Sequence, residues 1–248
     1  MEVKLIIPET WNDVTIETYQ KYIKIQNGKG SDKNKIIRSI ALLCGTTNKI
    51  VKAMPYSELL FIMQVIKDLV DAEPDRQNFE KLITLENEEY GFIPNMSKIT
   101  TGEYIDLELF CKEPIENLHI IMSILYRKIK LKRGERYSIE NYDPELFKEE
   151  VFKKCTMDIA LGSLGFFFDY RKQISNDFSQ LFGKSEQDTT KGLTMQSKWG
   201  WYNTLYSLCD GNILNIDKIT NLPILTVFTF LAYKQDYNNK MKNNYGNI

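Results

Sequence analysis

The stretch KWGWYNTLYSLCDGNILNIDKITNLPILTVFTFLAYKQDYNNKMK, residues 198–242, holds the densest run of apolar side chains in the chain. Its Trp, Tyr and Leu residues first recur at helical spacing, and Asp210 followed by Gly211 predicts the end of that helix. Asn221, just before Leu222 and Pro223, predicts the start of a second helix. We therefore expect a C-terminal helical hairpin whose two arms are joined by a short turn.

The second arm of this hairpin is apolar in nearly every direction. Its apolar residues are Leu222, Ile224, Leu225, Val227, Phe228, Phe230, Leu231 and Tyr233. A helix that is hydrophobic all round is normally buried. The pattern predicts that the second arm is covered on most of its sides.

Helical periodicity also dominates the rest of the chain, which predicts a mainly α protein: a multi-helix bundle with a small β-hairpin and the C-terminal helical hairpin. The first helices, up to about residue 70, should form a compact N-terminal bundle. Loose alternation around the turn at residues 86–89 predicts the β-hairpin. The expected divisions are a helical domain at 1–182 with a β insertion at about 79–94, a polar linker at 183–196, the hairpin module at 197–240 and a flexible tail at 241–248.

Composition describes an ordinary globular protein. The chain has 248 residues, of which 43% are hydrophobic and 26% charged, and its net charge is -1. Without a net positive charge it has no overall field to draw it to nucleic acid or an anionic membrane, so we expect neither as a partner. The N-terminus lacks the pattern of a signal peptide, and the longest apolar run is too short to span a bilayer.

No set of catalytic residues is apparent. Residues 183–185 resemble the end of a phosphate-binding loop, but the glycine required five positions earlier is Phe178. The only histidine, His119, is expected to be structural, and the four cysteines are too far apart for a metal-binding knuckle. We therefore predict no enzymatic activity, no cofactor and no metal.

Two segments are candidates for contacts with partners. The basic segment at residues 127–136 could meet phosphates, or it could be an ordinary exposed loop between helices. The aromatic cluster at the start of the hairpin could anchor a partner protein, or it could be buried against its own chain. The candidate contact residues are Arg127, Lys130, Lys132 and Arg133 in the first segment and Trp199, Trp201 and Tyr202 in the second.

The segment ALGSLGFFF, residues 160–168, places small residues beside three phenylalanines. Because small residues permit close backbone approach, we interpret it as a packing centre between helices.

Four segments together resemble a family of phage proteins: VKLIIPETWNDVTIETYQKY, LHIIMSILYRKIK, DIALGSLGFFF and the closing GWYNTLYSLCDGNILNIDKITNLPILTVFTFLAY. The family is that of the tail-associated or virion proteins, cargo or tail assembly, of crAss-like and related phages of Bacteroidetes. The likeness lies in aromatic and small residues spread over most of the chain. It brings no catalytic residues.

The resemblance implies a non-enzymatic bacteriophage protein, a structural or cargo protein of the virion that is located in the tail or interior after synthesis in the host cytoplasm. Its implied partners are other virion proteins of the tail, portal or ring, or further copies in a homo-oligomer. The closing segment is also similar to the C-terminal parts of tail assembly chaperones, so a chaperone absent from the mature particle is the alternative. A phosphate-binding or nucleolytic enzyme that uses the basic segment is a third hypothesis.

Overall fold

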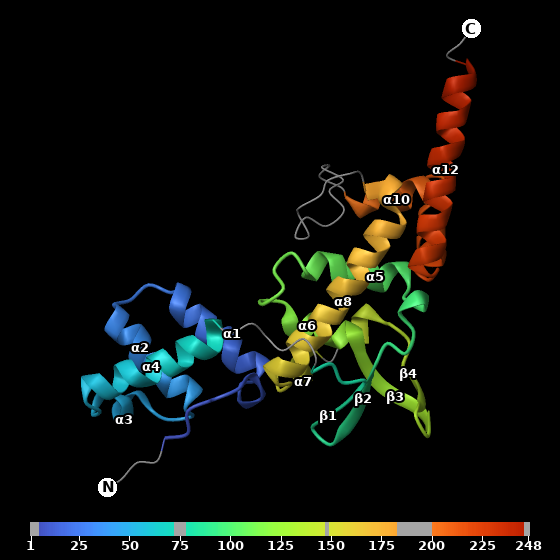
Figure 1. The fold of residues 1–248 in the computed structure, drawn as a ribbon. Coiled ribbons are helices and arrows are strands. Elements are labelled where there is room, and N and C mark those ends of the chain that lie inside the picture. Colours follow the sequence, from blue (N-terminus) through green and yellow to red (C-terminus); the bar gives the residue numbers. More distant parts are fainter. Residues whose placement is uncertain (1–4, 72–77, 147–148, 183–199, 246–248) are drawn as a thin grey trace.

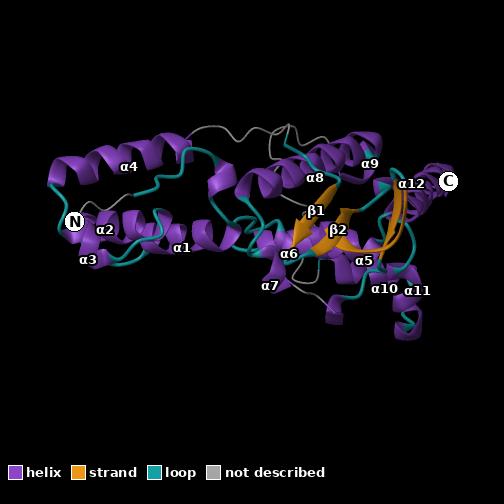
Figure 2. Cartoon of the chain, turned by 90° about the horizontal axis from the view of Figure 1, so that it is seen from below, coloured by secondary structure: helices purple, strands orange, loops and turns teal. Residues whose placement is uncertain are grey.

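The computed structural model describes residues 5–71, 78–146, 149–182 and 200–245. The protein is mainly α-helical with one four-stranded antiparallel sheet. It is elongated: the N-terminal helices lie at one end, the sheet and the remaining helices form the larger part, and α12 projects from the opposite end (Figure 1). Seen from below, the N-terminal helices are again set apart from the sheet (Figure 2).

The N-terminal bundle consists of α1 (Ile16–Asn27), α2 (Asp32–Leu43), α3 (Asn48–Lys52) and α4 (Tyr56–Asp71). Side-chain capping fixes where α1 starts: the Thr15 hydroxyl accepts a hydrogen bond from the backbone N–H of Thr18. Ile40, Val51 and Ile66 are fully buried in a hydrophobic cluster that belongs to the bundle. The bundle predicted from the sequence thus has its own core, distinct from that of the larger part.

The sheet contains β1 (Leu82–Leu85), β2 (Glu88–Phe92), β3 (Tyr126–Arg133) and β4 (Arg136–Ile139), paired in that order. Strands β1 and β2 form the hairpin expected at residues 79–94. The interpretation of residues 127–136 as a loop between helices is wrong, because these residues form most of the β3–β4 hairpin. Gly134 at the turn has φ +59°, a left-handed conformation that glycine adopts without steric cost.

The larger part packs the sheet against helices. These helices are α5 (Thr101–Phe110), α6 (Leu118–Leu125), α7 (Glu149–Phe152), α8 (Met157–Asp177) and α9 (Ser179–Phe182). Short 3-10 turns precede or link them at Trp11–Asp13, Met96–Lys98 and Pro144–Leu146. The core includes Tyr104, Tyr126 and Phe167, each buried.

The packing centre predicted at residues 160–168 lies in α8, and the nearest neighbour of Gly162 in it is not another helix. A Cβ atom on Gly162 would lie 2.7 Å from the carbonyl oxygen of Asn78, in the extended chain before β1. The hydroxyl groups of Ser163 and Tyr126 share a hydrogen bond of 2.8 Å. The Phe166 ring stacks on the Phe79 ring, with 4.6 Å between the ring centroids. Gly162 therefore leaves room for the polypeptide that leads into the sheet.

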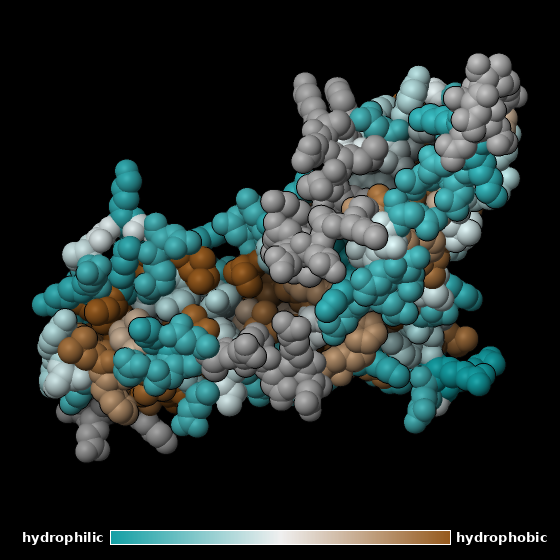
Figure 3. All heavy atoms as spheres, turned by 45° about the horizontal axis from the view of Figure 1, so that its top comes forward, coloured by the Kyte–Doolittle hydropathy of each residue, from teal (hydrophilic) through white to brown (hydrophobic). Residues whose placement is uncertain are grey.

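Backbone hydrogen bonds join the N-terminal bundle to the larger part. Ile16 N–H donates to the Cys155 carbonyl at 2.9 Å, and Met157 N–H donates to the Val14 carbonyl at 2.8 Å. Hydrophobic side chains are visible on the surface of the bundle and in the hollow where it meets the rest of the chain (Figure 3).

The C-terminal segment contains α10 (Trp201–Leu208), a 3-10 turn (Ile213–Asn215), α11 (Ile216–Thr220) and α12 (Ile224–Tyr245). The short turn expected between two arms is thus a longer connection that includes α11. Helix α12 continues to Tyr245, which is within the segment 241–248 predicted to be a flexible tail. The predicted linker at 183–196 lies outside the described residues.

The expectation that α12 is covered on most sides is wrong as well. Ile224 and Phe228 are buried in the main core, whereas Phe230 and Tyr233 are exposed. The helix is apolar on two opposite faces, and its own chain covers one of them.

Candidate functional site

The basic residues singled out in the sequence all lie on β3. Arg127 is at its start, next to the core, and Lys132 and Arg133 are at its far end beside the turn. Trp201 and Tyr202 lie on α10, away from the sheet (Figure 1). Trp199 is outside the part of the chain that the structure describes. The structure therefore separates the two sets of candidate residues into two surfaces.

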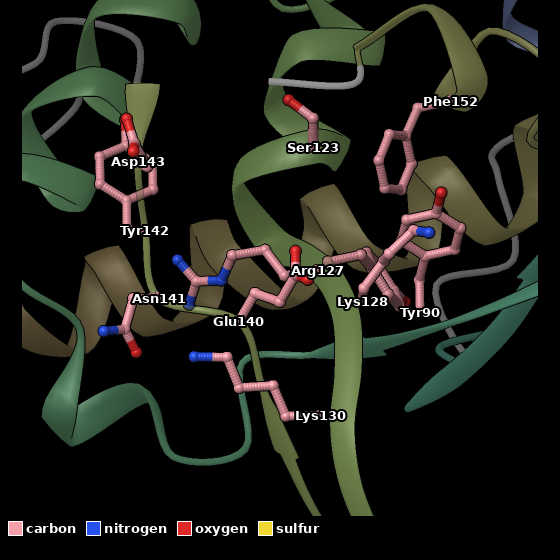
Figure 4. Close-up of a pocket in the computed structure, with 11 residues that line it drawn as sticks. Tyr90, Ser123, Arg127, Lys128, Lys130, Glu140, Asn141, Tyr142, Asp143 and Phe152 are labelled. Atoms are coloured by element: carbon pink, nitrogen blue, oxygen red, sulfur yellow. The ribbon is translucent and has the colours of Figure 1, made fainter. Parts of the chain in front are cut away.

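A cleft of about 460 Å³ opens beside β3 (Figure 4). Strands β2 and β3, helices α6 and α7 and the segment after β4 contribute its walls. The lining residues are Tyr90, Ser123, Tyr126, Arg127, Lys128, Lys130, Glu140, Asn141, Tyr142, Asp143 and Phe152. Of the basic residues predicted as contacts, Arg127 and Lys130 are in this cleft.

Arg127 is held in place by α5. Its Nη1 donates to Oε1 of Glu103, and both side chains are largely buried, with 13% and 4% of their surface exposed. The other carboxylate oxygen of Glu103 accepts from the backbone N–H of Thr100 at 2.6 Å in the capping box of α5. One carboxylate thus fixes both the start of a helix and the orientation of the guanidinium.

Tyr142 holds Arg127 from another side. The Cζ atom of Arg127 lies 5.8 Å from the centroid of the Tyr142 ring, within the range of a cation–π interaction. The Tyr142 hydroxyl donates to Oδ2 of Asp106 on α5. Burial raises the pKa of the Asp106 carboxyl, and the hydrogen bond from Tyr142 opposes that rise.

The remaining basic residues of β3 differ in how they are paired. Lys128 pairs with Glu88 at 2.6 Å, and Lys132 pairs with Glu89, both across the strand pair to β2. Lys130 and Arg133 are exposed and have no ion pair with any residue in the described ranges. The acidic residues of β2 thus neutralise much of the charge that suggested contact with phosphates.

The aromatic residues of α10 divide between core and surface. The Trp201 ring lies 6.2 Å from Tyr104 and 6.1 Å from Phe228, so its own chain surrounds much of it. Tyr202 is exposed. For Trp201 the alternative of packing within its own chain is the one observed.

A surface that the sequence interpretation missed lies on α12. Its residues Phe230, Tyr233, Tyr237 and Met241 are 52%, 65%, 50% and 37% exposed, and we call them the α12 stripe. Tyr237 follows the buried Phe228 by about two and a half helical turns, so the stripe is opposite the face that packs on the core. The spacing of three, four and four residues is visible in the sequence, but it was hidden among the other apolar residues.

His119 and possible metal ligands were the remaining chemical candidates in the sequence. Nδ1 of His119 lies 3.1 Å from Nε2 of Gln20, and burial lowers the pKa of the imidazole, consistent with a structural role. No group of three or more His, Cys, Asp or Glu residues in the described ranges could hold a metal ion, and no helix there is long and apolar enough to cross a bilayer. Residues 183–185 lie outside those ranges.

Comparison with models of protein families, with curated proteins and with solved structures found no match.

Proposed function

We propose that this chain is a non-enzymatic virion protein of a bacteriophage, located in the tail or interior, that acts through protein–protein contacts of the α12 stripe. The phage context comes from the sequence resemblance. In this proposal the C-terminal helices α10 to α12 serve as a module that presents the stripe to another virion protein.

The observation that carries the proposal is the second apolar face of α12. Residues at i, i+3, i+7 and i+11 of one helix, starting from Phe230, are the arrangement with which a helix enters an apolar groove of another protein. Tyr and Phe are rigid, and their burial contributes large areas at low entropic cost. A helix whose stripe had no partner would expose these side chains to water without benefit.

The size of the stripe fits the centre of an interface. Four such side chains with about half of their roughly 200 Å² exposed present about 400 Å² of mostly apolar surface. A standard interface buries about 800 Å² on each partner. The stripe can therefore supply the central residues of a contact, and neighbouring positions of α12 and α10 would supply its rim.

The anchoring of α12 supports a role in presenting the stripe. Thr101 N–H and Oγ1 both donate to the Leu222 carbonyl, at 2.8 and 2.9 Å, and Ile224 N–H donates to the Ile99 carbonyl at 2.9 Å. These bonds tie the start of the helix to α5. Figure 1 shows the remainder of the helix extending beyond α10.

The test is quantitative mass spectrometry of gradient-purified particles, with the copy number of this chain compared with that of the portal. We expect a fixed ratio for the wild-type protein and a loss of about tenfold or more for Tyr233→Ser combined with Tyr237→Ser. The matched control is Tyr56→Ser, because Tyr56 is similarly exposed, at 56%, but lies on the N-terminal bundle.

Normal incorporation of the double variant would refute the role of the stripe. Abundance of the wild-type chain in lysate but not in particles would refute the virion assignment and favour the assembly chaperone.

A further inference from the structure

We propose that the cleft beside β3 binds a small organic monoanion, a carboxylate with an apolar body, through Arg127, Lys130 and Asn141. This site is distinct from the α12 stripe and does not depend on the function proposed above.

Arg127 is the fixed donor of the site. Its Nε is buried and has no hydrogen-bond partner among the described residues, and its one described hydrogen bond, from Nη1, goes to Glu103. A buried donor without an acceptor costs about 1–3 kcal/mol, and a guanidinium offers a planar edge that suits a carboxylate. The ion pair with Glu103 and the Tyr142 ring already orient it, so binding would cost little additional ordering.

Lys130 is the second cation of the site, and the backbone places its side chain in the cleft. Ile129 pairs with Ile139 and Leu131 pairs with Ser138, so Lys130 is the extra residue of a β-bulge. Bulges redirect a side chain from the regular alternation of a strand. Lys130 lines the cleft and has no ion pair within the described part of the chain.

Asn141 completes the set of donors from the segment after β4. Its side chain makes no hydrogen bond to any residue that the structure describes. In Figure 4 the Lys130 amine, the Asn141 amide and the Arg127 guanidinium lie on the same side of the cleft. Three nitrogen donors from two neighbouring segments therefore face one region.

The charge and the walls of the cleft select the class of ligand. Arg127 and Lys128 are paired with Glu103 and Glu88, so Lys130 is the cation of the lining that has no ion pair among the described residues. The carboxylates of Glu140 and Asp143 also line the cleft, and they repel a dianion such as inorganic phosphate more strongly than a monoanion.

The opposite wall is apolar. It consists of the buried rings of Tyr90, Tyr126 and Phe152. A volume of about 460 Å³ is within the range of small-molecule sites, so the cleft has room for an apolar body attached to the carboxylate.

The test is an NMR titration of the isotope-labelled full chain at low ionic strength with benzoate, its neutral isostere benzamide, and inorganic phosphate. We expect saturable shifts with benzoate and at least about tenfold weaker binding of benzamide and of phosphate, a difference of about 1.4 kcal/mol. Lys130→Ala should weaken benzoate binding about fivefold or more, and Lys130→Arg should largely retain it.

The matched control is Lys132→Ala, on the same strand but paired with Glu89 and outside the cleft. It should change the benzoate affinity less than about twofold. The proposal is overturned if benzoate up to about 10 mM gives no saturable shifts, if benzamide or phosphate binds as well, or if the two lysine-to-alanine variants lose affinity equally.

Discussion

Replacing Gly162 by alanine tests the close approach of α8 to the chain that leads into the sheet. The new Cβ atom would lie 2.7 Å from the Asn78 carbonyl oxygen, 2.9 Å from its carbonyl carbon and 3.2 Å from the Phe79 nitrogen. Carbon atoms in favourable contact are about 3.5–4.0 Å apart, so the backbone must move by roughly half an ångström or more. All three neighbours are backbone atoms, and none can rotate away.

Two effects oppose each other in this variant. Alanine is a better helix former than glycine by about 1 kcal/mol in a helix interior. Overpacking of a well-packed core costs about 1–3 kcal/mol, and the movement would also disturb Phe79, whose ring stacks on Phe166 at 4.6 Å and meets the edge of Phe92 at 4.8 Å. We expect the steric cost to exceed the helical gain and the free energy of unfolding to fall by about 1–2 kcal/mol.

Urea denaturation followed by tryptophan fluorescence measures the effect, because Trp11 and Trp201 both pack against the main core. The matched control is Gly102→Ala in α5, where the nearest atoms to the new Cβ belong to Thr220 at 3.5 Å, an ordinary contact. That variant should be as stable as the wild type, or more stable by up to about 1 kcal/mol. If Gly162→Ala were as stable as the Gly102→Ala control, the inferred close approach would be incorrect.

Three further predictions concern other parts of the fold. Glu103→Ala leaves the Arg127 guanidinium without its buried partner and removes the capping box of α5. We expect the free energy of unfolding, measured by urea denaturation, to fall by about 3–5 kcal/mol, and a fall of less than about 1 kcal/mol would contradict this reasoning. Ile66→Ala should destabilise the N-terminal bundle by about 2–5 kcal/mol, which hydrogen exchange would show as faster exchange in α2 and α4 than in α8. Burial raises the pKa of the Cys155 thiol from 9.0 to about 12, so the thiol stays protonated in the folded protein. The unfolded thiol ionises near pH 9, so the contribution of this group to the free energy of unfolding is complete below pH 9 and is lost as the pH rises towards 12. Denaturation at pH 8, 9 and 10 should show a lower midpoint at pH 10, and Cys155→Ser should reduce that dependence.

The helices of the N-terminal bundle could be predicted because their signals are local. Thr15 caps α1, Ser31 precedes α2, and the apolar residues of each helix repeat at helical spacing. The β3–β4 hairpin could not be recognised in the same way. Its lysines and arginines suggested an exposed loop, and the partners that make them compatible with a strand, Glu88 and Glu89, lie on β2, far away in sequence.

The candidate cleft shows the same limit. The sequence drew attention to Arg127 and Lys130 by their charge, but Glu103 and Tyr142, which orient Arg127, come from other segments. The bulge at Lys130 depends on the register of two strands, which sequence periodicity alone does not determine.

The exposure of the α12 stripe was beyond prediction for a different reason. A helix that is apolar on two faces has the same sequence pattern whether its second face packs on its own chain or on another protein. Phe228 and Tyr237 differ in burial because the chain supplies neighbours on only one side. That difference is a property of the assembled fold.

Helix α12 is held by the rest of the chain at its N-terminal end, so bending would move its C-terminal end the most. Among the residues whose burial the structure describes, Ala232 is the last buried one along the helix, and Lys234 still donates a hydrogen bond to Ser207 of α10 at 3.2 Å. The helix continues to Tyr245, and the eleven residues beyond Lys234 extend roughly 16 Å, so a bend of about 10° there displaces the tip by roughly 3 Å. A bend there moves Tyr237 and Met241 of the α12 stripe while the cleft and the sheet remain undisturbed.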